Sequence, residues 1–414
     1  MKLSARAQRI EPFYVMEMAK TASAIAAQAA GTDRPMIYLN IGEPDFTAPP
    51  LVAEAAAKAI RDGRTQYTQA TGLPALRERI SSWYAQRFGI DVPARRIVVT
   101  AGASAALQLA CLALLDAGDE VLMPDPSYPC NRQFVSMADA RAVMLPATAA
   151  ERFQLSADKV AAAWGPRTRG VMLASPSNPT GTSIHPDELR HIHAAVAARG
   201  GVTVVDEIYL GLSYDDTYSH SALAIGDDII SINSFSKYFN MTGWRLGWLV
   251  VPDALVPTVE QIAQHLFICP STVAQHAALA CFEPQSLAEY ERRRAEFKAR
   301  RDWFVPQLHA LGLSVPVTPD GAFYAWADCR AACARLFGNR SEYNSDMPAS
   351  TQTPDSQTQG SWAFAHELMQ RAHIAVTPGR DFGHASTASH IRFSTASAMP
   401  QLQAAVARLK EVLA

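Results

Sequence analysis

No apolar run in this chain approaches the roughly 18 residues that a membrane-spanning helix requires. The chain also lacks an excess of charge of either sign, because its formal net charge is −2 over 414 residues. A nucleic-acid-binding protein would carry a basic stripe, so this balance argues against that class. The basic residues at the N-terminus precede no apolar segment, which argues against a secretory signal. We therefore expect a globular protein with neither membrane nor nucleic acid among its partners.

Several chemical signatures are missing as well. The six cysteines form no CxxC pair, and we interpret them as reduced, mostly buried thiols of a cytoplasmic protein. The chain contains no GxGxxG, Walker A or GxSxG motif. His185, His191 and His193 lie near two acidic residues, but their spacing is typical of a solvated helix face rather than a zinc site. We therefore predict no metal.

The length exceeds that of one ordinary hydrophobic core and favours two domains. Continuous apolar runs alternate with helix-like segments such as Ser104–Leu115 and Pro186–Ala198. Such runs are typical of strands buried on both faces. The sequence therefore predicts an α/β fold whose large domain holds a mostly parallel seven-stranded sheet covered by helices. The predicted strands are Ile97–Thr100, Glu120–Met123, Ala142–Leu145, Gly170–Ser175, Val202–Asp206, Ile229–Asn233 and Leu246–Val251.

A smaller α/β domain is predicted after the large one. A densely charged segment, Ser286–Leu311, is typical of a long exposed helix leaving the large domain. Strands near Phe323–Ala327 and His390–Ser394 would belong to the small domain. We expect residues 1–45 to form an N-terminal arm that has no sheet of its own and packs on the small domain. Residues 46–285 would form the large domain, and residues 286–414 the long helix and the small domain. Residues 338–360 are polar and are expected to form a mobile surface insertion.

Lys237 is the first candidate for catalysis, in a chain with only seven lysines and thirty arginines. Aromatic residues surround it in the stretch SFSKYFNMTGWRLGW, together with Ser234, Ser236 and Arg245. Apolar surroundings lower the pKa of a lysine and make it a carbonyl-trapping amine. Hydroxyls and an arginine are suited to a phosphate ester. This combination indicates pyridoxal phosphate, although a surface lysine in an aromatic loop is the alternative for Lys237 taken alone.

Three further features point to the same kind of site. The strand Ile97–Thr100 runs into small residues, Ala101–Ser104, which would let an anion approach a helix N-terminus. Asp206 ends an apolar strand, where it could pair with a protonated pyridine nitrogen or merely cap the next helix. Asn178, between two prolines, could bind a ring oxygen or stabilise a turn. Each feature alone is weak evidence.

Together the motifs resemble fold-type I pyridoxal-phosphate aminotransferases of class I, the aspartate aminotransferase-like family. SPSNPTG, VDEIY and SFSKYFNMTGWRLGW occur in the family's order and spacing. Further similar blocks are LNIGEPDF, QYTQATGLPALRE, DPSYPCN and HIRFSTA. The likeness runs from about residue 8 to the C-terminus, except 338–360. It implies transfer of an amino group from an L-amino acid to a 2-oxo acid by a ping-pong mechanism, in a homodimer.

The resemblance also implies roles for individual residues. Lys237 would bind the cofactor covalently and later carry the substrate's α-proton. Asp206 would pair with the cofactor's ring nitrogen, while Tyr209 and Asn178 would hydrogen-bond its ring oxygen. Tyr128 would stack on the ring.

The two ends of the site would bind anions. Arg392 would clasp the substrate α-carboxylate, helped by Asn178 and the backbone of Gly42. Tyr67 of each chain would reach the other chain's phosphate, so that two chains share each site. The remaining phosphate ligands would be Gly102, Ala103, Ser104, Ser234 and Arg245.

Two alternatives accompany this interpretation. A C–S β-lyase or related eliminating enzyme uses the same fold and the same cofactor. A cofactor-binding regulator would need a DNA-binding module, and none fits into the 45 or so residues before the core. For an aminotransferase, the apolar arm segment Glu11–Met18 favours neutral or aromatic donors, with pyruvate or 2-oxoglutarate as acceptor. Arg132 is the nearest cation that could instead bind a dicarboxylate, unless it faces solvent or pairs with an acid.

Overall fold

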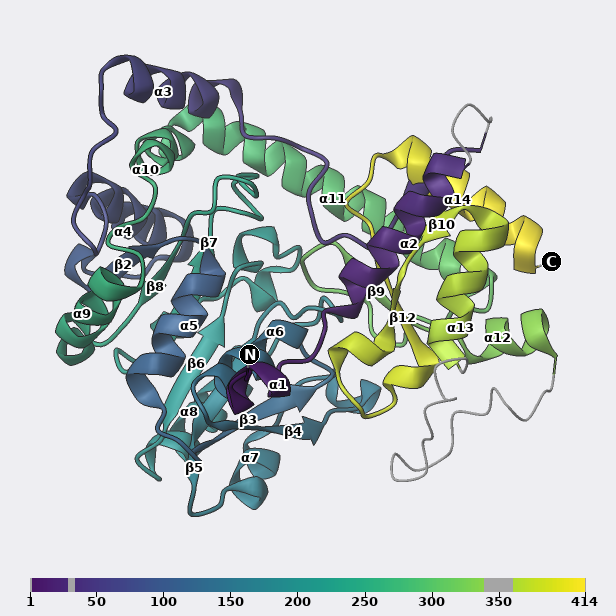
Figure 1. Ribbon diagram of the computed structural model, residues 1–414, viewed down its shortest axis with the longest axis horizontal. Helices are drawn as coiled ribbons and strands as arrows, with labels where there is room; N and C mark the ends of the chain where they lie inside the picture. The colour runs from purple at the N-terminus through teal and green to yellow at the C-terminus, as the bar shows by residue number, and fades with distance from the viewer. Residues whose placement is uncertain (1, 29–33, 339–359, 414) are drawn as a thin grey trace.

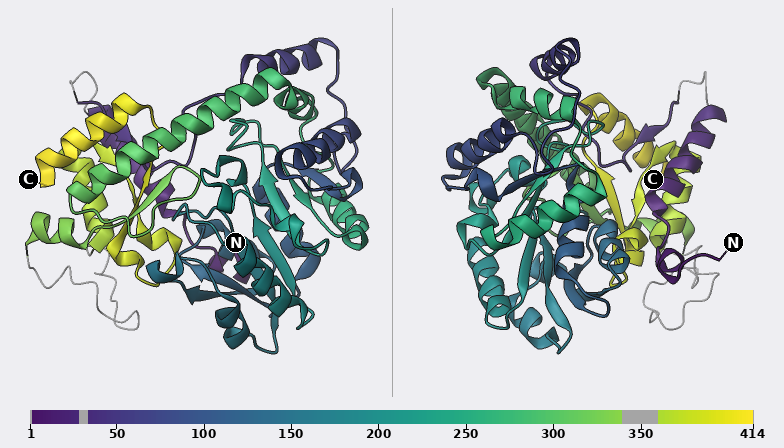
Figure 2. Two further views of the ribbon diagram at one scale, coloured as in Figure 1. Left: turned by 180° about the vertical axis from the view of Figure 1, so that it is seen from behind. Right: turned by 60° about the vertical axis from the view of Figure 1, so that its left-hand side comes forward.

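The computed structural model describes residues 2–28, 34–338 and 360–413. A large and a small α/β unit lie at opposite ends of the long helix α11 (Pro284–Ala310) (Figure 1). Seen from behind, α11 runs along one side of the molecule from one unit to the other (Figure 2). The predicted insertion at 338–360 falls almost wholly outside the described residues. Within the described part, no helix is both long and apolar enough to cross a membrane.

The large unit is built on a seven-stranded sheet with the order β2-β8-β7-β6-β5-β3-β4. Only β8 runs against its neighbours β7 and β2, and the other pairings are parallel. The sequence prediction of a mostly parallel seven-stranded sheet is confirmed. The strands are β2 (Ile97–Thr100), β3 (Glu120–Asp125), β4 (Arg141–Pro146), β5 (Thr168–Ala174), β6 (Val202–Asp206), β7 (Ile230–Ser234) and β8 (Gly247–Val250).

Both faces of this sheet are covered by helices, which explains why the strands are mostly apolar. Val204 and Val205 are neighbours in β6, yet they belong to two separate hydrophobic clusters on opposite faces. One face packs on α5 (Ala103–Leu114), α6 (Pro129–Met137) and α9 (Val256–Leu266). The other packs on α4 (Pro74–Phe88), α7 (Ala157–Ala163), α8 (Pro186–Ala197) and α10 (Thr272–Leu279), and α3 (Pro50–Arg61) packs on α10.

The parallel strands all end at one edge of the sheet. This edge brings together the last residues of β6 and β7, Asp206 and Ser234, and the turn after β2 that contains Gly102. Open α/β sheets bind their ligands at this edge. The sheet topology therefore collects side chains that are far apart in the sequence.

The small unit holds an antiparallel sheet of β11 (Thr377–Pro378), β12 (His390–Ser394) and β9 (Tyr324–Asp328). Its core combines residues of α11 with those of the covering helices. Those helices are α12 (Arg330–Phe337), α13 (Gly360–Glu367), which a π-helical turn (Leu368–Ala372) follows, and α14 (Met399–Leu413).

The N-terminal arm packs on the small unit, where the sequence placed it, and also contacts the large unit. Helix α2 (Tyr14–Gln28) packs on the small unit, and β1 (Ile37–Tyr38) pairs in parallel with its strand β10 (Ile374–Ala375). Helix α1 (Ala5–Arg9), in contrast, lies against α6 of the large unit, where Arg6 and Arg9 form ion pairs with Asp139. The arm therefore spans the boundary between the two units.

Candidate active site

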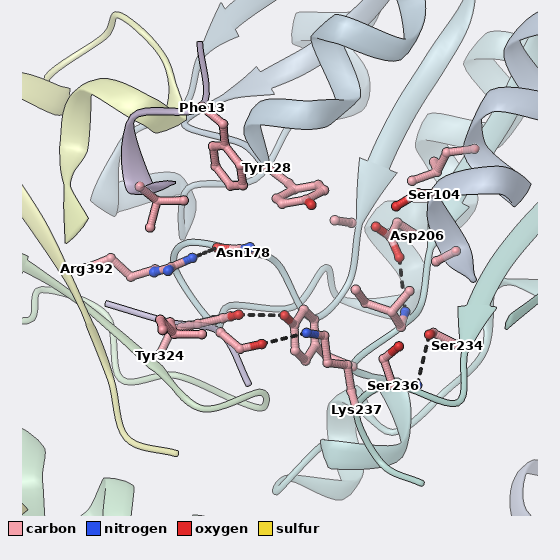
Figure 3. A pocket seen from close by; sticks show the side chains of 18 of the residues that line it. Phe13, Ser104, Tyr128, Asn178, Asp206, Ser234, Ser236, Lys237, Tyr324 and Arg392 are labelled. Carbon is pink, nitrogen blue, oxygen red and sulfur yellow. Dashed lines mark hydrogen bonds between the residues drawn. The ribbon is translucent and has the colours of Figure 1, made fainter. Parts of the chain in front are cut away.

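A cavity of about 400 Å³ lies between the carboxyl edge of the large sheet, the small unit and the arm (Figure 3). Its size falls in the range typical of small-molecule sites. Two predicted site residues do not line it: Gly102, which immediately precedes the lining residue Ala103, and Tyr67. The other predicted residues all line it: Gly42, Ala103, Ser104, Tyr128, Asn178, Asp206, Tyr209, Ser234, Lys237, Arg245 and Arg392.

Lys237 reaches the cavity from the loop after β7. Its Nζ donates a hydrogen bond of 2.6 Å to the backbone oxygen of Gly42. The same Nζ lies 5.6 Å and 5.9 Å from the ring centroids of Tyr209 and Phe323. Burial, with a smaller contribution from the nearby Arg392, lowers the pKa of this amine to about 8. About a tenth of Lys237 is therefore neutral and nucleophilic at pH 7, far more than for an ordinary lysine.

Asp206 is buried at the end of β6, with 4% of its surface exposed. The one hydrogen bond that its carboxylate accepts in the described structure comes from the backbone N–H of Ile208, at 3.1 Å. Burial raises the pKa of this carboxyl to about 7. The adjacent Glu207 is different, because two serine hydroxyls and the backbone N–H of Ala222 bind its carboxylate. Asp206 therefore lacks a cationic partner, and a cation in the cavity would supply one.

The start of α5 forms a cradle for an anion. Gly102 precedes the helix with a φ of 85°, and a side chain there would lie 2.5 Å from Nη2 of Arg245. The guanidinium is held by Thr242, whose backbone oxygen accepts from Nη1 at 2.9 Å. Ser104 and Ser234 line the cavity nearby. A helix N-terminus, an arginine and two hydroxyls at one place are suited to a phosphate group.

Arg392 forms the opposite end of the cavity. Its Nη1 donates to Oδ1 of Asn178 at 2.8 Å, and its Nη2 donates to the backbone oxygen of Asn40 at 2.6 Å. The guanidinium lies between the rings of Tyr324 and Phe382, at 4.4 Å and 5.0 Å from their centroids. Its buried Nε has no protein partner. This fixed, incompletely paired guanidinium is suited to a carboxylate ligand.

Aromatic side chains wall the remaining side. Tyr128 immediately precedes α6 and points into the cavity beside Phe13 of the arm, with the two rings edge to face at 6.5 Å (Figure 3). The sequence analysis named the arm segment that contains Phe13 but gave that residue no role.

Tyr67 lies in the segment between α3 and α4 and is 79% exposed. Its predicted contact with a second chain stays a prediction.

Asn40 and Tyr324 are among the lining residues that were not predicted from the sequence. Asn40 lies in the LNIGEPDF block, of which only Gly42 was singled out. Tyr324 begins β9, where an aromatic residue is equally typical of a strand core.

The histidines around α8 do not form a metal site. His185 accepts a hydrogen bond from the backbone of Asp187, and His193 contacts Thr203. Among the residues with described positions, no group of three or more histidine, cysteine or acidic side chains could hold a metal ion.

A family model described as aminotransferase class I and II matches residues 34–409. The chain belongs to this family. It is 35% identical over 401 residues to a valine–pyruvate aminotransferase of Mycobacterium tuberculosis, covering 97% of this chain and 96% of the relative. It is 32% identical over 414 residues to an aspartate aminotransferase of Geobacillus stearothermophilus, covering 99% and 98%.

Solved structures agree with these relatives. A crystal structure of an aminotransferase from Mycobacterium tuberculosis superposes with a TM-score of 0.88 at 35% identity, covering 100% of this chain and 99% of the other. Aspartate aminotransferase from Thermus thermophilus with maleate gives a TM-score of 0.87 at 29% identity, covering all of both chains. The protein is therefore a pyridoxal-phosphate-dependent aminotransferase, and the lyase alternative gains no support.

The cavity of this aminotransferase fits pyridoxal phosphate. The buried Asp206 lacks a cation, which a protonated ring nitrogen would provide, and the cradle at Gly102 and Arg245 is suited to the phosphate. When bound, the cofactor withdraws electrons from the substrate's α-carbon and so acidifies its proton. Lys237, as a neutral amine, can then take that proton, while Arg392 orients the substrate by its carboxylate.

The first prediction concerns the pH dependence of the cofactor-free enzyme. The folded-state pKa of Asp206, about 7, lies above its ordinary value of 3.8. The favourable contribution of this carboxyl to folding is therefore present below about pH 4 and is lost as the pH rises through 7. Relative to wild type, Asp206→Asn should gain up to about 4 kcal/mol in free energy of unfolding between pH 4 and pH 8, measured by urea unfolding.

The matched control is Asp253→Asn. Arg95 binds this exposed carboxyl and lowers its pKa, so its removal cannot produce a gain with rising pH. A constant difference between wild type and Asp206→Asn over the whole pH range would contradict the account of Asp206.

The second prediction concerns Lys237. Borohydride reduction of the holoenzyme, followed by peptide mapping, should place the cofactor on this lysine alone. Lys237→Arg keeps the positive charge but cannot form the bond, so it should bind the cofactor reversibly and lose all but a trace of activity. Covalent label on any of the other six lysines would contradict the assignment.

Proposed function

We propose that this aminotransferase transfers the amino group of an uncharged L-amino acid to pyruvate, by a ping-pong mechanism, in a cytoplasmic homodimer. The observation that carries the donor preference is the count of cations at the cavity. In the described chain, only Lys237, Arg245 and Arg392 carry positive charge there. The cofactor link, the phosphate and the substrate α-carboxylate would use all three. A second substrate carboxylate would then have no cationic partner within the chain.

Arg132 does not supply this missing charge. It donates to a carboxylate oxygen of Glu11 at 3.0 Å and 3.2 Å, and to the backbone oxygen of Asp381 at 2.9 Å. It is largely buried by these contacts and does not line the cavity. Of the alternatives open from sequence, pairing with an acid is therefore the one found.

The arm adds an apolar wall where a substrate side chain would lie. This wall favours uncharged side chains through burial, although one methylene changes discrimination by only about 1–3 kcal/mol. It consists of Phe13, Val15, Met16, Ala19 and Ile41.

The acceptor is constrained by the same cavity, because donor and acceptor occupy it in turn. 2-Oxoglutarate carries a second carboxylate and meets the same lack of a cation, so the proposal favours pyruvate. The similarity to a valine–pyruvate aminotransferase supports this choice, whereas the aspartate aminotransferases among the relatives favour dicarboxylates. The small number of cations in this chain's own cavity supports pyruvate rather than a dicarboxylate.

The proposed dimer rests on exposed apolar residues around Tyr67. Gln66 and Thr272 are joined by a hydrogen bond of 2.7 Å, and near them in sequence Tyr67 and Ile268 are 79% and 51% exposed. Ile60 of α3 is also exposed. A second copy of the chain would bury this region and receive Tyr67. The cytoplasmic assignment rests on the six cysteines, all free thiols.

The test of the proposed function is a panel of amino donors with pyruvate as acceptor. We expect kcat/KM for valine, alanine or phenylalanine to exceed that for aspartate at least about tenfold, a difference of about 1.4 kcal/mol. Keto-acid formation with parallel lines in double-reciprocal plots would support ping-pong transfer. A hundredfold preference for aspartate would contradict the proposal, and Arg132→Met would then show whether that arginine is responsible.

Sharing of the active site can be tested by mixing two inactive variants. Suppose that each site combines Lys237 of one chain with Tyr67 of the other. A heterodimer of one Tyr67→Ala chain and one Lys237→Ala chain then retains one intact site. Random exchange makes half of the dimers heterodimers, so activity should recover to about one quarter of wild type. The unmixed variants are the controls. No recovery despite demonstrated exchange would contradict a shared site.

A further inference from the structure

We propose that Tyr324 is a positioning residue that directs the hydroxyl of Tyr209 toward the cofactor from across the boundary between the two units. The proposal rests on the function proposed above and on the role that the family resemblance implies for Tyr209, a hydrogen bond to the cofactor's ring oxygen.

The two tyrosines form a hydrogen-bonded pair at the cavity. Their hydroxyl oxygens lie 2.7 Å apart, and the two side chains are 2% and 1% exposed (Figure 3). The rings meet nearly at right angles, with centroids 5.6 Å apart. In the described structure, Tyr324 is the only hydrogen-bond partner of the Tyr209 hydroxyl. The orientation of the Tyr209 proton therefore depends on Tyr324.

This pair joins the two units of the protein. Tyr209 follows β6 of the large unit, whereas Tyr324 begins β9 of the small unit. Strand β9 pairs with β12, which carries Arg392, and the Tyr324 ring lies 4.4 Å from the centre of the Arg392 guanidinium. A single side chain of the small unit thus contacts both the substrate clasp and a cofactor ligand.

The backbone around Tyr324 is fitted to its hydroxyl. A side chain at Gly42 would overlap this oxygen, so the close approach requires glycine. The backbone oxygen of Gly42 in turn accepts the hydrogen bond from Lys237. The hydroxyl of Tyr324 is therefore fixed at the point where the environments of Tyr209 and Lys237 meet.

The chemistry follows from the number of protons in the pair. Each hydroxyl has one proton, so the pair can share only one hydrogen bond at a time. When Tyr324 donates, Tyr209 keeps its own proton free for a ligand in the cavity, and a hydroxyl that accepts one hydrogen bond donates more strongly. Burial raises the pKa of both phenols, but that of Tyr324 less strongly, because Arg392 over its ring and the hydrogen bond with Tyr209 oppose the rise; Tyr324 is therefore the more acidic phenol and the favoured donor. Tyr209 is thereby directed to donate into the cavity.

The test uses the visible absorbance of the cofactor bound to Lys237, titrated with pH in the absence of substrate. Donation from Tyr209 stabilises the ring oxygen most when the bound cofactor has lost its proton. Weaker donation by Tyr209 should therefore raise the pKa of the bound cofactor, which the absorbance titration measures. We expect Tyr324→Phe to raise it by about 0.5 to 1, the effect of one neutral hydrogen bond, and to lower kcat more than it raises KM.

A double-variant cycle separates positioning from an independent effect. If Tyr324 acts through Tyr209, then Tyr209→Phe/Tyr324→Phe should show the same pKa as Tyr209→Phe alone. Additive shifts, or no shift in Tyr324→Phe, would overturn the proposal. Failure of the wild-type protein to bind the cofactor or to transaminate would instead count against the proposed function.

The matched control is Tyr214→Phe. The Tyr214 hydroxyl donates to the backbone oxygen of Ala322, two residues before Tyr324, and Tyr214 does not line the cavity. Its loss perturbs the same segment without touching Tyr209, so the absorbance titration should be unchanged. A shift in this control equal to that of Tyr324→Phe would show a general loosening of the segment and would overturn the positioning role.

Discussion

The burial of one carboxyl group, that of Asp206, is the constraint around which this active site is arranged. Strand β6 is paired on both sides and covered by helices on both faces, so the carboxylate at its end is desolvated, and in the described structure no side chain hydrogen-bonds to it. The adjacent Glu207 is equally buried, but hydroxyl and backbone donors surround it. Two consecutive acids therefore have different roles: Glu207 stabilises the fold, and Asp206 remains available to a cation in the cavity.

The two units supply different parts of the chemistry, and this division follows from topology. The carboxyl edge of the large sheet provides the amine, the acid and the anion cradle, because all parallel strands end there. Arg392 comes from the small unit and lies across the cavity from that edge. The arm closes the remaining side by contacting both units, through α1 on the large one and α2 on the small one. Substrate can therefore be oriented only where the two units and the arm meet.

The sequence was sufficient to predict the sheet and most of the site, for physical reasons. Strands buried on both faces are continuously apolar, so all seven could be located without knowledge of their partners. The site residues follow strand ends in recognisable motifs. Contacts that depend on tertiary geometry alone could not be predicted. These include the ion pairs of Arg6 and Arg9 with Asp139, and the pairing of Arg132 with Glu11. Tyr324 was missed because its aromatic strand looks like ordinary core.

Arg245 and Arg392 also link the basicity of Lys237 to whether anions are bound in the cavity. Burial is the largest cause of its lowered pKa, and the nearby guanidinium groups of Arg392 and Arg245 lower it further. A phosphate at Arg245 and a carboxylate at Arg392 would neutralise these charges and remove part of that effect. The amine would therefore be less basic in the empty cavity than with both anions bound. With both anions bound it would regain part of its basicity, which suits the transfer of the α-carbon proton that we expect of it. The two arginines that are expected to bind these anions would thus also make Lys237 a better base once the site is filled.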